Sequence, residues 1–284
     1  MTAIPFCKFH GFGNDYIVIG RDAIPSSVDL QQLAIDICNR HTGAGSDGIA
    51  VVEKLTNGDA DYFCEIVNPD GSIAGFSGNG TRCAVAYLYY KGLWDQPALK
   101  LETRSGVKNY SLQGNPSDGV YVFKAEIGKP KFRSSDVPVT GNVVDAVIDR
   151  EIPVDDRSFV ISGVNVGNPV ACTFVEDFDL DWRRYGRLME THTIFPERAN
   201  IVFVRVIDRE NIELRIWERG AGETSASGTC SSGAAVLSAF TGRTGRNVSV
   251  HSPGGITEVQ WREDDEILLS GQAVFSYCGE FPFR

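Results

Sequence analysis

The sequence predicts an α+β protein of two pseudo-symmetric halves, each a curled, mostly antiparallel sheet around one buried central helix. Three observations lead to this fold class. Much of the chain alternates apolar and polar residues between turn signals, which is typical of strands. Two segments are apolar nearly all round, which is typical of helices buried within a fold. Those two segments also begin in the same way, which indicates an internal duplication.

Six segments are expected to be strands because of this alternation. They are Asp61–Val67, Val120–Ile127, Ser158–Val164, Asn200–Asp208, Ile212–Glu218 and Glu258–Leu269. Amphipathic helices are predicted at Val28–Arg40 and Asp181–Thr191, and the buried helices at Gly80–Lys91 and Thr229–Phe240. The apolar face of the first amphipathic helix is formed by Leu30, Leu33, Ile35 and Ile37.

The starts of the two buried helices match each other. The first follows Ser77–Thr81 and the second follows Ser225–Thr229, with Ser77 and Ser227 about half a chain apart. Turn residues cluster between 115 and 130 and place the boundary of the halves there. The predicted N-terminal half is 1–125 with a C-terminal strand at 270–284, and the C-terminal half is 126–269.

Charge and composition exclude several classes of function. A net charge of −10 argues against a nucleic-acid partner, which needs clustered Lys and Arg. The apolar run around Cys83–Tyr90 is far too short to cross a bilayer, and the first residues lack a secretory pattern. We therefore expect no membrane partner and a cytoplasmic location.

The seven cysteines and four histidines are widely spaced along the chain. No Cys-x-x-Cys pair occurs, so the sequence predicts free thiols, with neither a disulfide framework nor a metal site.

The glycine-rich helix starts suggest a binding site. A turn that leads into a helix exposes unpaired backbone N–H groups at the positive end of the helix dipole, where a carboxylate or phosphate binds. Two such starts facing each other across a cleft between the halves would hold one small anion, with Ser77 and Ser227 directed at the same atom. Each serine is alternatively an ordinary N-cap.

Two other interpretations, a dinucleotide-binding site and a serine hydrolase, have less support in the sequence. Gly43–Gly48 matches G-x-G-x-x-G, but the strand-like Ile49–Val52 follows it where a dinucleotide site needs a helix. A serine hydrolase stays open as an alternative, although no G-x-S-x-G surrounds either serine.

Several motifs together resemble the diaminopimelate epimerase family, in that family's order and spacing. They are Phe9–Tyr16 (the family has H-G-x-G-N-D-F), Arg40–Gly48, Asn68–Ser72, Ser77–Cys83 (C-G-N-G-x-R-C), Gly167–Pro169, Phe195–Asn200, Glu218–Thr224, Ser225–Thr229 (A-C-G-[ST]) and Gly271–Phe275. The resemblance covers essentially the whole chain. It implies a cofactor-free 1,1-proton transfer at the α-carbon of an amino acid, in which one cysteine removes the proton and a second returns one to the other face.

The resemblance also implies the site residues. Ser77 and Ser227 take the positions of the two catalytic cysteines. The distal amino-acid end and the carboxylates of the substrate would be held by Asn14, Asn68, Asn168, Asn200 and Arg219. N–H groups for the reacting α-carboxylate, onto which charge moves when the proton leaves, would come from Gly78, Asn79, Gly228 and Thr229.

The sequence departs from the family pattern at the acid–base centre. Serine replaces both cysteines, Val170 stands where the family usually has a histidine thought to tune a thiol, and Gly48 stands where many members have glutamine. A serine hydroxyl is a far weaker acid than a thiol and normally needs an adjacent base. The joint loss of thiols and histidine indicates a centre that has changed as a unit.

Several functions stay open at this stage. The chain could epimerise slowly, catalyse a related reaction such as dehydration, or bind amino acids without turnover. Glu218 belongs by the resemblance to the substrate-binding residues, and it could instead serve as the base of a phenazine-type isomerase. In each case the expected partner is a small amino acid, with no cofactor and no metal, and a homodimer is the default oligomer.

Overall fold

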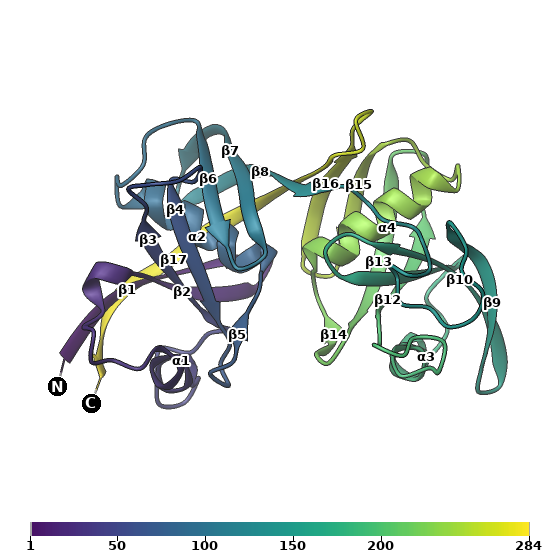
Figure 1. Cartoon of the computed structure of the whole chain (residues 1–284), viewed down its shortest axis with the longest axis horizontal. Coiled ribbons are helices and arrows are strands. Elements are labelled where there is room, and N and C mark those ends of the chain that lie inside the picture. Colours follow the sequence, from purple (N-terminus) through teal and green to yellow (C-terminus); the bar gives the residue numbers. More distant parts are fainter. Residues whose placement is uncertain (1, 284) are drawn as a thin grey trace. The chain divides into compact units, whose positions relative to one another are not determined.

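The computed structural model describes residues 2–283 and divides the chain into two compact units (Figure 1). Unit 1 is Met1–Ala125 together with Gly271–Arg284, and unit 2 is Glu126–Ser270. Both end residues lie outside the described part. The predicted α+β class is confirmed, because each unit is built mostly of strands and contains two α-helices.

Unit 1 contains strands, two α-helices and a short 3-10 turn at Arg21–Ala23. In chain order they are β1 (Thr2–Gly11), β2 (Asn14–Gly20), α1 (Leu30–Cys38), β3 (Ile49–Lys54), β4 (Tyr62–Val67), β5 (Ile73–Ala74), α2 (Gly78–Tyr90), β6 (Ala98–Thr103), β7 (Gly106–Ser117), β8 (Val120–Gly128) and the returning strand β17 (Ile267–Phe283). The chain passes from one unit to the other within β8 and again within β17.

Unit 2 repeats this composition. Its elements are β9 (Val147–Val154), β10 (Arg157–Asn165), β11 (Pro169–Phe174), α3 (Trp182–Glu190), β12 (Asn200–Val206), β13 (Asn211–Glu218), β14 (Gly222–Thr224), α4 (Gly228–Phe240), β15 (Asn247–Ser252) and β16 (Gly255–Trp261).

The strand pairings of the two units correspond one to one. In unit 1, β2 runs parallel to β3, β3 antiparallel to β4, and β4 pairs antiparallel with β5 and parallel with β6. In unit 2, β11, β12, β13, β14 and β15 pair in the same order and the same directions. The equivalent helices follow equivalent strands, so α1 matches α3 and α2 matches α4. This correspondence supports an internal duplication.

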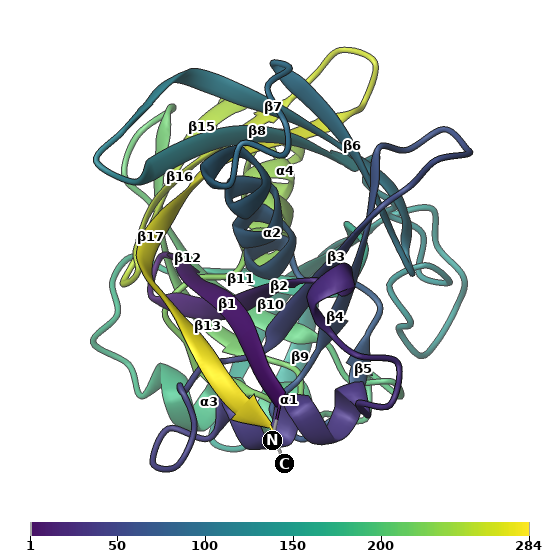
Figure 2. The ribbon, with the colours of Figure 1, turned by 90° about the vertical axis from the view of Figure 1, so that its left-hand side faces the viewer.

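Each unit encloses one helix, as the apolar segments predict. Asn79–Leu88 of α2 is buried throughout, and α2 contacts β1, β2, β3, β4 and β6 (Figure 2). Cys230–Ser238 of α4 is likewise buried, and α4 packs on β10, β11, β12, β15 and β16. The two helix starts are therefore held by the cores of their own units.

Two details of the predicted elements are wrong. Glu258–Leu269 is not one strand, because Arg262 donates its N–H to the carbonyl of Glu266 and closes a turn in which Asp265 has a φ of 68°. On α1 the buried residues are Leu33, Ala34, Ile37 and Cys38, whereas Ile35 is 41% exposed. Ile35 lies two positions from Leu33 and Ile37, which puts it on the opposite side of a helix.

The prediction that all cysteines are free thiols is also wrong. Cys7 on β1 and Cys278 on β17 lie directly opposite each other and form a disulfide. Their separation of 271 residues hides the pairing in the sequence. The free cysteines are all buried: Cys38, Cys64, Cys83, Cys172 and Cys230. Among the described residues, no helix is long and apolar enough to span a membrane.

Removing the disulfide should destabilise the protein. A Cys7→Ser, Cys278→Ser chain is expected to lose about 2–4 kcal/mol of unfolding free energy, because the crosslink restrains the unfolded chain. Denaturant unfolding without reductant measures the loss, and reduction of the unmodified protein should reproduce it. Thiol titration of the denatured, unreduced chain should find the five free cysteines. Seven reactive thiols would contradict the crosslink.

Candidate active site

Ser77 begins α2 and has two hydrogen-bonding partners. As the N-cap, its Oγ accepts the N–H of Gly80 at 3.1 Å. The hydroxyl of Tyr16, on β2, lies 2.9 Å from the same Oγ. Ser77 is therefore an N-cap, as the local pattern alone suggests, but its hydroxyl is also paired with a buried phenol that has no counterpart in an ordinary cap.

Ser227 begins α4 in the same backbone conformation. Its φ and ψ are −147° and 124°, compared with −139° and 119° at Ser77. The Oγ accepts the N–H of Cys230 at 3.4 Å and donates to Oε2 of Glu218 at 3.0 Å. Ser227 is buried, with 8% of its surface exposed. The two helix starts thus match in backbone and differ in the group that meets the hydroxyl.

Glu218, at the end of β13, is a buried carboxyl that accepts the hydrogen bond of Ser227. Burial raises the pKa of its carboxyl, and the hydrogen bond from Ser227 opposes part of that rise. A carboxylate that receives the proton of a serine hydroxyl makes the serine oxygen a better proton acceptor. Unit 2 thus pairs the hydroxyl at its helix start with a buried carboxyl.

A chain of amide hydrogen bonds fixes Asn14 and Asn79 beside Ser77. Nδ2 of Asn79 donates to Oδ1 of Asn14 at 3.1 Å, and Nδ2 of Asn14 donates to Asp47 at 2.8 Å. Arg82, which is buried, donates to Oδ1 of Asn79 and to the carbonyl of Gln272. The structure therefore brings Asn14, Ser77 and Asn79 together, as the resemblance implies.

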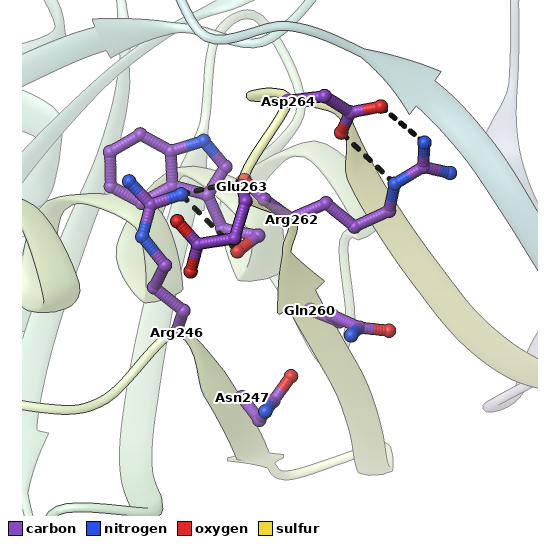
Figure 3. A pocket seen from close by; sticks show the side chains of 7 residues that line it. Arg246, Asn247, Gln260, Arg262, Glu263 and Asp264 are labelled. Atoms are coloured by element: carbon purple, nitrogen blue, oxygen red, sulfur yellow. Dashed lines mark hydrogen bonds and ion pairs between the residues drawn. The ribbon is translucent and has the colours of Figure 1, made fainter.

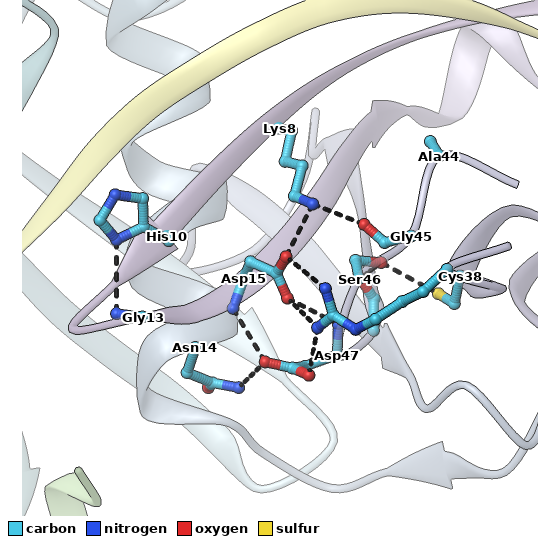
Figure 4. A network of polar contacts seen from close by, with 12 residues as sticks. Lys8, His10, Gly13, Asn14, Asp15, Cys38, Ala44, Gly45, Ser46 and Asp47 are labelled. Atoms are coloured by element: carbon cyan, nitrogen blue, oxygen red, sulfur yellow. Dashed lines mark hydrogen bonds and ion pairs between the residues drawn. The ribbon is translucent and has the colours of Figure 1, made fainter. Parts of the chain in front are cut away.

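A carboxylate cluster anchors the Asn14 end of this chain (Figure 4). Burial would raise the pKa of Asp15, but hydrogen bonds from Arg40 and Lys8 outweigh it and hold the pKa at about 2. Arg40 also bridges to Asp47, which accepts the N–H of Asp15. These charges bond to one another, so their role is to position the loop that carries Asn14.

Asn200 and Arg219 meet in unit 2. Oδ1 of Asn200 accepts the backbone N–H of Arg219 at 2.8 Å, and the Arg219 guanidinium, which is exposed, donates to the carbonyl of Glu197. Glu190 on α3 holds the adjoining turn, because its carboxylate accepts from Trp217 and from the N–H of Gly220. Sequence reasoning missed Glu190, since a glutamate at the end of an amphipathic helix gives no sign of burial.

The remaining predicted residues lie in turns and at helix starts. Asn68 follows β4, and its side chain donates to Ser72 within the turn. Asn168 precedes β11, after Gly167 with a φ of 104°. The first helical residues, whose N–H groups no helical carbonyl takes, are Gly78, Asn79, Gly228 and Thr229.

Val170 makes a core contact. It is fully buried on β11, and a Cβ at Gly233 of α4 would lie 3.0 Å from the valine. The position is thus occupied by packing between strand and helix and supplies no acid or base to Ser227.

Unit 2 also has a surface pocket that is separate from the predicted site residues. It is lined by Arg246, Asn247, Gln260, Trp261, Arg262, Glu263 and Asp264 (Figure 3). Arg262 pairs with Asp264 within it, and none of the predicted site residues lines it.

Comparison with known proteins decides the family. The family model for diaminopimelate epimerase matches residues 6–132 and 162–276. The chain belongs to the diaminopimelate epimerase family. A diaminopimelate epimerase of Caldanaerobacter subterraneus subsp. tengcongensis is 40% identical over 278 residues, which cover 97% of this chain and 98% of that protein. One of Pelotomaculum thermopropionicum is 36% identical over 283 residues, covering 98% and 99%.

Solved structures share the fold at low sequence identity. A hydroxyproline epimerase from Agrobacterium vitis has a TM-score of 0.71 at 15% identity and covers 99% of this chain and 92% of its own. A PhzF-family phenazine biosynthesis protein from Bacillus anthracis has a TM-score of 0.70 at 17% identity, with complete coverage of both chains. These neighbours support the two-half α+β architecture of the epimerase family.

The buried Glu218 carboxyl should reveal itself in the pH dependence of stability. Because its pKa is raised in the folded state, the stability it contributes at low pH is lost as the pH rises through the folded pKa. The unfolding midpoint of Glu218→Gln, relative to the unmodified protein, is therefore expected to rise as the pH increases from about 4, the pKa of an unfolded glutamate, through the raised folded pKa.

Glu213 on the same strand is the matched control. Burial raises its pKa, but hydrogen bonds from Arg205 and Arg215 outweigh this and lower it overall. Glu213→Gln should therefore lose stability relative to the unmodified protein as the pH rises from below the lowered folded pKa to about 5, and the difference should stay constant above that. If the unfolding midpoints of the two variants changed with pH in the same way, the different environments assigned to these carboxyls would be refuted.

Proposed function

We propose that this chain is a cofactor-independent amino-acid epimerase that interconverts LL- and meso-diaminopimelate, a step of lysine and cell-wall biosynthesis. Full-length similarity to diaminopimelate epimerases supports the substrate. The observation that carries the chemistry is the Ser227–Glu218 hydrogen bond, because it pairs a hydroxyl at a catalytic position of the family with a buried carboxylate.

Ser227 is proposed to remove the α-proton. Its Oγ takes the proton as Glu218 accepts the hydroxyl proton, so that no free alkoxide has to form. The departing electron pair moves onto the α-carboxylate of the substrate. Ser77, at the equivalent helix start of the other unit, is proposed as the acid that returns a proton.

The helix starts are proposed to stabilise the charge that develops. The N–H groups of Gly78 and Asn79 in unit 1, and of Gly228 and Thr229 in unit 2, lie at the positive ends of buried helices. Donors fixed in advance at such ends favour the ion-like transition state over the ground state.

The remaining predicted residues are proposed to select the substrate. Arg219 suits the distal carboxylate, since its guanidinium can bond two oxygens at once. The amide side chains proposed to hold the distal amino-acid group and carboxylates are Asn14, Asn68, Asn168 and Asn200. The hydrogen bonds of Asn14 and Asn79 support this role by fixing the side chains before substrate binds.

Two other functions compete with this proposal. A carboxylate-dependent isomerase of the phenazine type is favoured by the buried Glu218 and by the shared fold. An amino-acid-binding protein without turnover is favoured by the weak acidity of serine. Each unit of pKa mismatch costs about 1.4 kcal/mol of activation free energy, so unaided hydroxyls would lose orders of magnitude in rate.

A cytoplasmic location and a homodimer are proposed with this function. The five buried free cysteines fit a reducing compartment, whereas the Cys7–Cys278 disulfide does not. A closed twofold dimer is the commonest assembly among soluble homo-oligomers.

Exchange of the α-proton in deuterated water tests the proposed reaction. Loss of the α-proton NMR signal of LL- and meso-diaminopimelate is expected with the unmodified chain, and Glu218→Gln should slow it by about 10²-fold or more. A Ser77→Cys, Ser227→Cys chain should exchange faster, because thiols are stronger acids. If the unmodified chain does not exchange, the epimerase proposal is wrong, whatever the cysteine chain does. Calorimetric binding without exchange would then favour the binding protein.

A further inference from the structure

We propose that Tyr16 is the proton donor that makes Ser77 a working acid, so that the N-terminal helix start carries a Tyr16–Ser77 relay in place of a thiol. This inference rests on the proposed epimerase function. It assigns a role to a residue of β2 that lies 61 positions from Ser77 in the chain and directly against it in the fold.

The tyrosine is held in one orientation by its surroundings. Tyr16 is only 6% exposed, and its hydroxyl lies 2.9 Å from Oγ of Ser77. Its ring fills the space beside two glycines: a Cβ added at Gly48 or at Gly80 would lie 2.8 Å from ring atom Cε1. No larger residue fits at either position while the ring stays in place. The contact with Ser77 is thus built into the packing.

The ring of Tyr16, Gly48 and Ser77 fit together at this point. Gly48 leaves room for the ring, and the hydroxyl of the tyrosine ends at Ser77. The phenol is therefore seated against the start of α2 by close packing as well as by its hydrogen bond.

In the proposed relay Tyr16 donates to Ser77, so that the hydroxyls of Ser77 and Ser227 have opposite hydrogen-bonding roles. At Ser227 the hydroxyl donates to the Glu218 carboxylate, which leaves an oxygen lone pair for an incoming proton. At Ser77 the oxygen accepts the N–H of Gly80, and a donated Tyr16 hydroxyl fills a second lone pair. The proton of Ser77 then points away from both donors and is available to the substrate.

The relay balances as a proton transfer. Ser77 gives its hydroxyl proton to the carbanionic α-carbon and receives the phenolic proton of Tyr16, which is left as phenolate. A phenol has an ordinary pKa of about 10 and is a far stronger acid than an aliphatic alcohol. The charge therefore ends on the tyrosine instead of on an alkoxide. A proton from solvent water restores the phenol after turnover.

A double-mutant cycle tests the relay. Tyr16→Phe is measured in the unmodified chain and in a Ser77→Cys chain, with α-proton exchange of diaminopimelate as the readout. In the unmodified chain we expect kcat to fall about 10²-fold with little change in KM, because Tyr16 acts through Ser77 and does not touch substrate. In the Ser77→Cys chain the loss should shrink to under about threefold, since a thiol carries its own acidity.

Tyr110→Phe is the matched control. The hydroxyl of Tyr110 lies 2.6 Å from Oγ1 of Thr81 on the same helix, so its removal also deletes a buried tyrosine contact with α2 but spares Ser77. Tyr110→Phe should lower the unfolding midpoint without a comparable loss of kcat. Thermal unfolding of every variant separates folding from catalysis.

Three results would overturn the relay. Equal losses from Tyr16→Phe in both backgrounds would show that the hydroxyl serves only packing. A loss of kcat in Tyr110→Phe as large as that in Tyr16→Phe would have the same meaning. Exchange by the unmodified chain with an unchanged kcat in Tyr16→Phe would refute the relay alone, whereas no exchange by the unmodified chain would refute the epimerase function with it.

Discussion

The hydrogen bond from a helix N–H to a serine oxygen is the interaction on which the rest of the structure depends. It places the hydroxyls of Ser77 and Ser227 at the positive ends of α2 and α4, the two helices that each unit buries. Burial of the helices fixes their starts, and the caps fix the hydroxyls relative to the free N–H groups. The same N-cap hydrogen bond therefore stabilises the helix and positions the reactive oxygen.

Serine at these two positions strengthens the helix N-cap and weakens the acidity of the side chain. An oxygen accepts a helix N–H better than sulfur does, which favours the cap, while the hydroxyl gives up its own proton far less readily than a thiol. The weaker acidity of the hydroxyls is offset by neighbouring side chains. Tyr16 is hydrogen-bonded to Ser77, and Glu218 accepts the hydroxyl of Ser227. A pair of similar thiols is replaced by two unlike pairs.

The sequence predicts what depends on local pattern and fails where distant segments meet. The buried helices, the fold class and the serine caps follow from apolar runs and small residues at helix starts. The Tyr16 contact and the burial of Glu190 depend on how strands and helices pack, which no spacing reveals. The pairing of Cys7 with Cys278 depends on β17 returning beside β1, so spacing gave the wrong result there.

The return of β17 to β1 also sets an order of events during synthesis. Unit 2 is one continuous stretch of chain, whereas unit 1 needs the last strand to complete its sheet. On the ribosome, unit 1 has to wait with an open strand edge along β1 until the last residues of the chain arrive. The first half translated is thus the last to be finished.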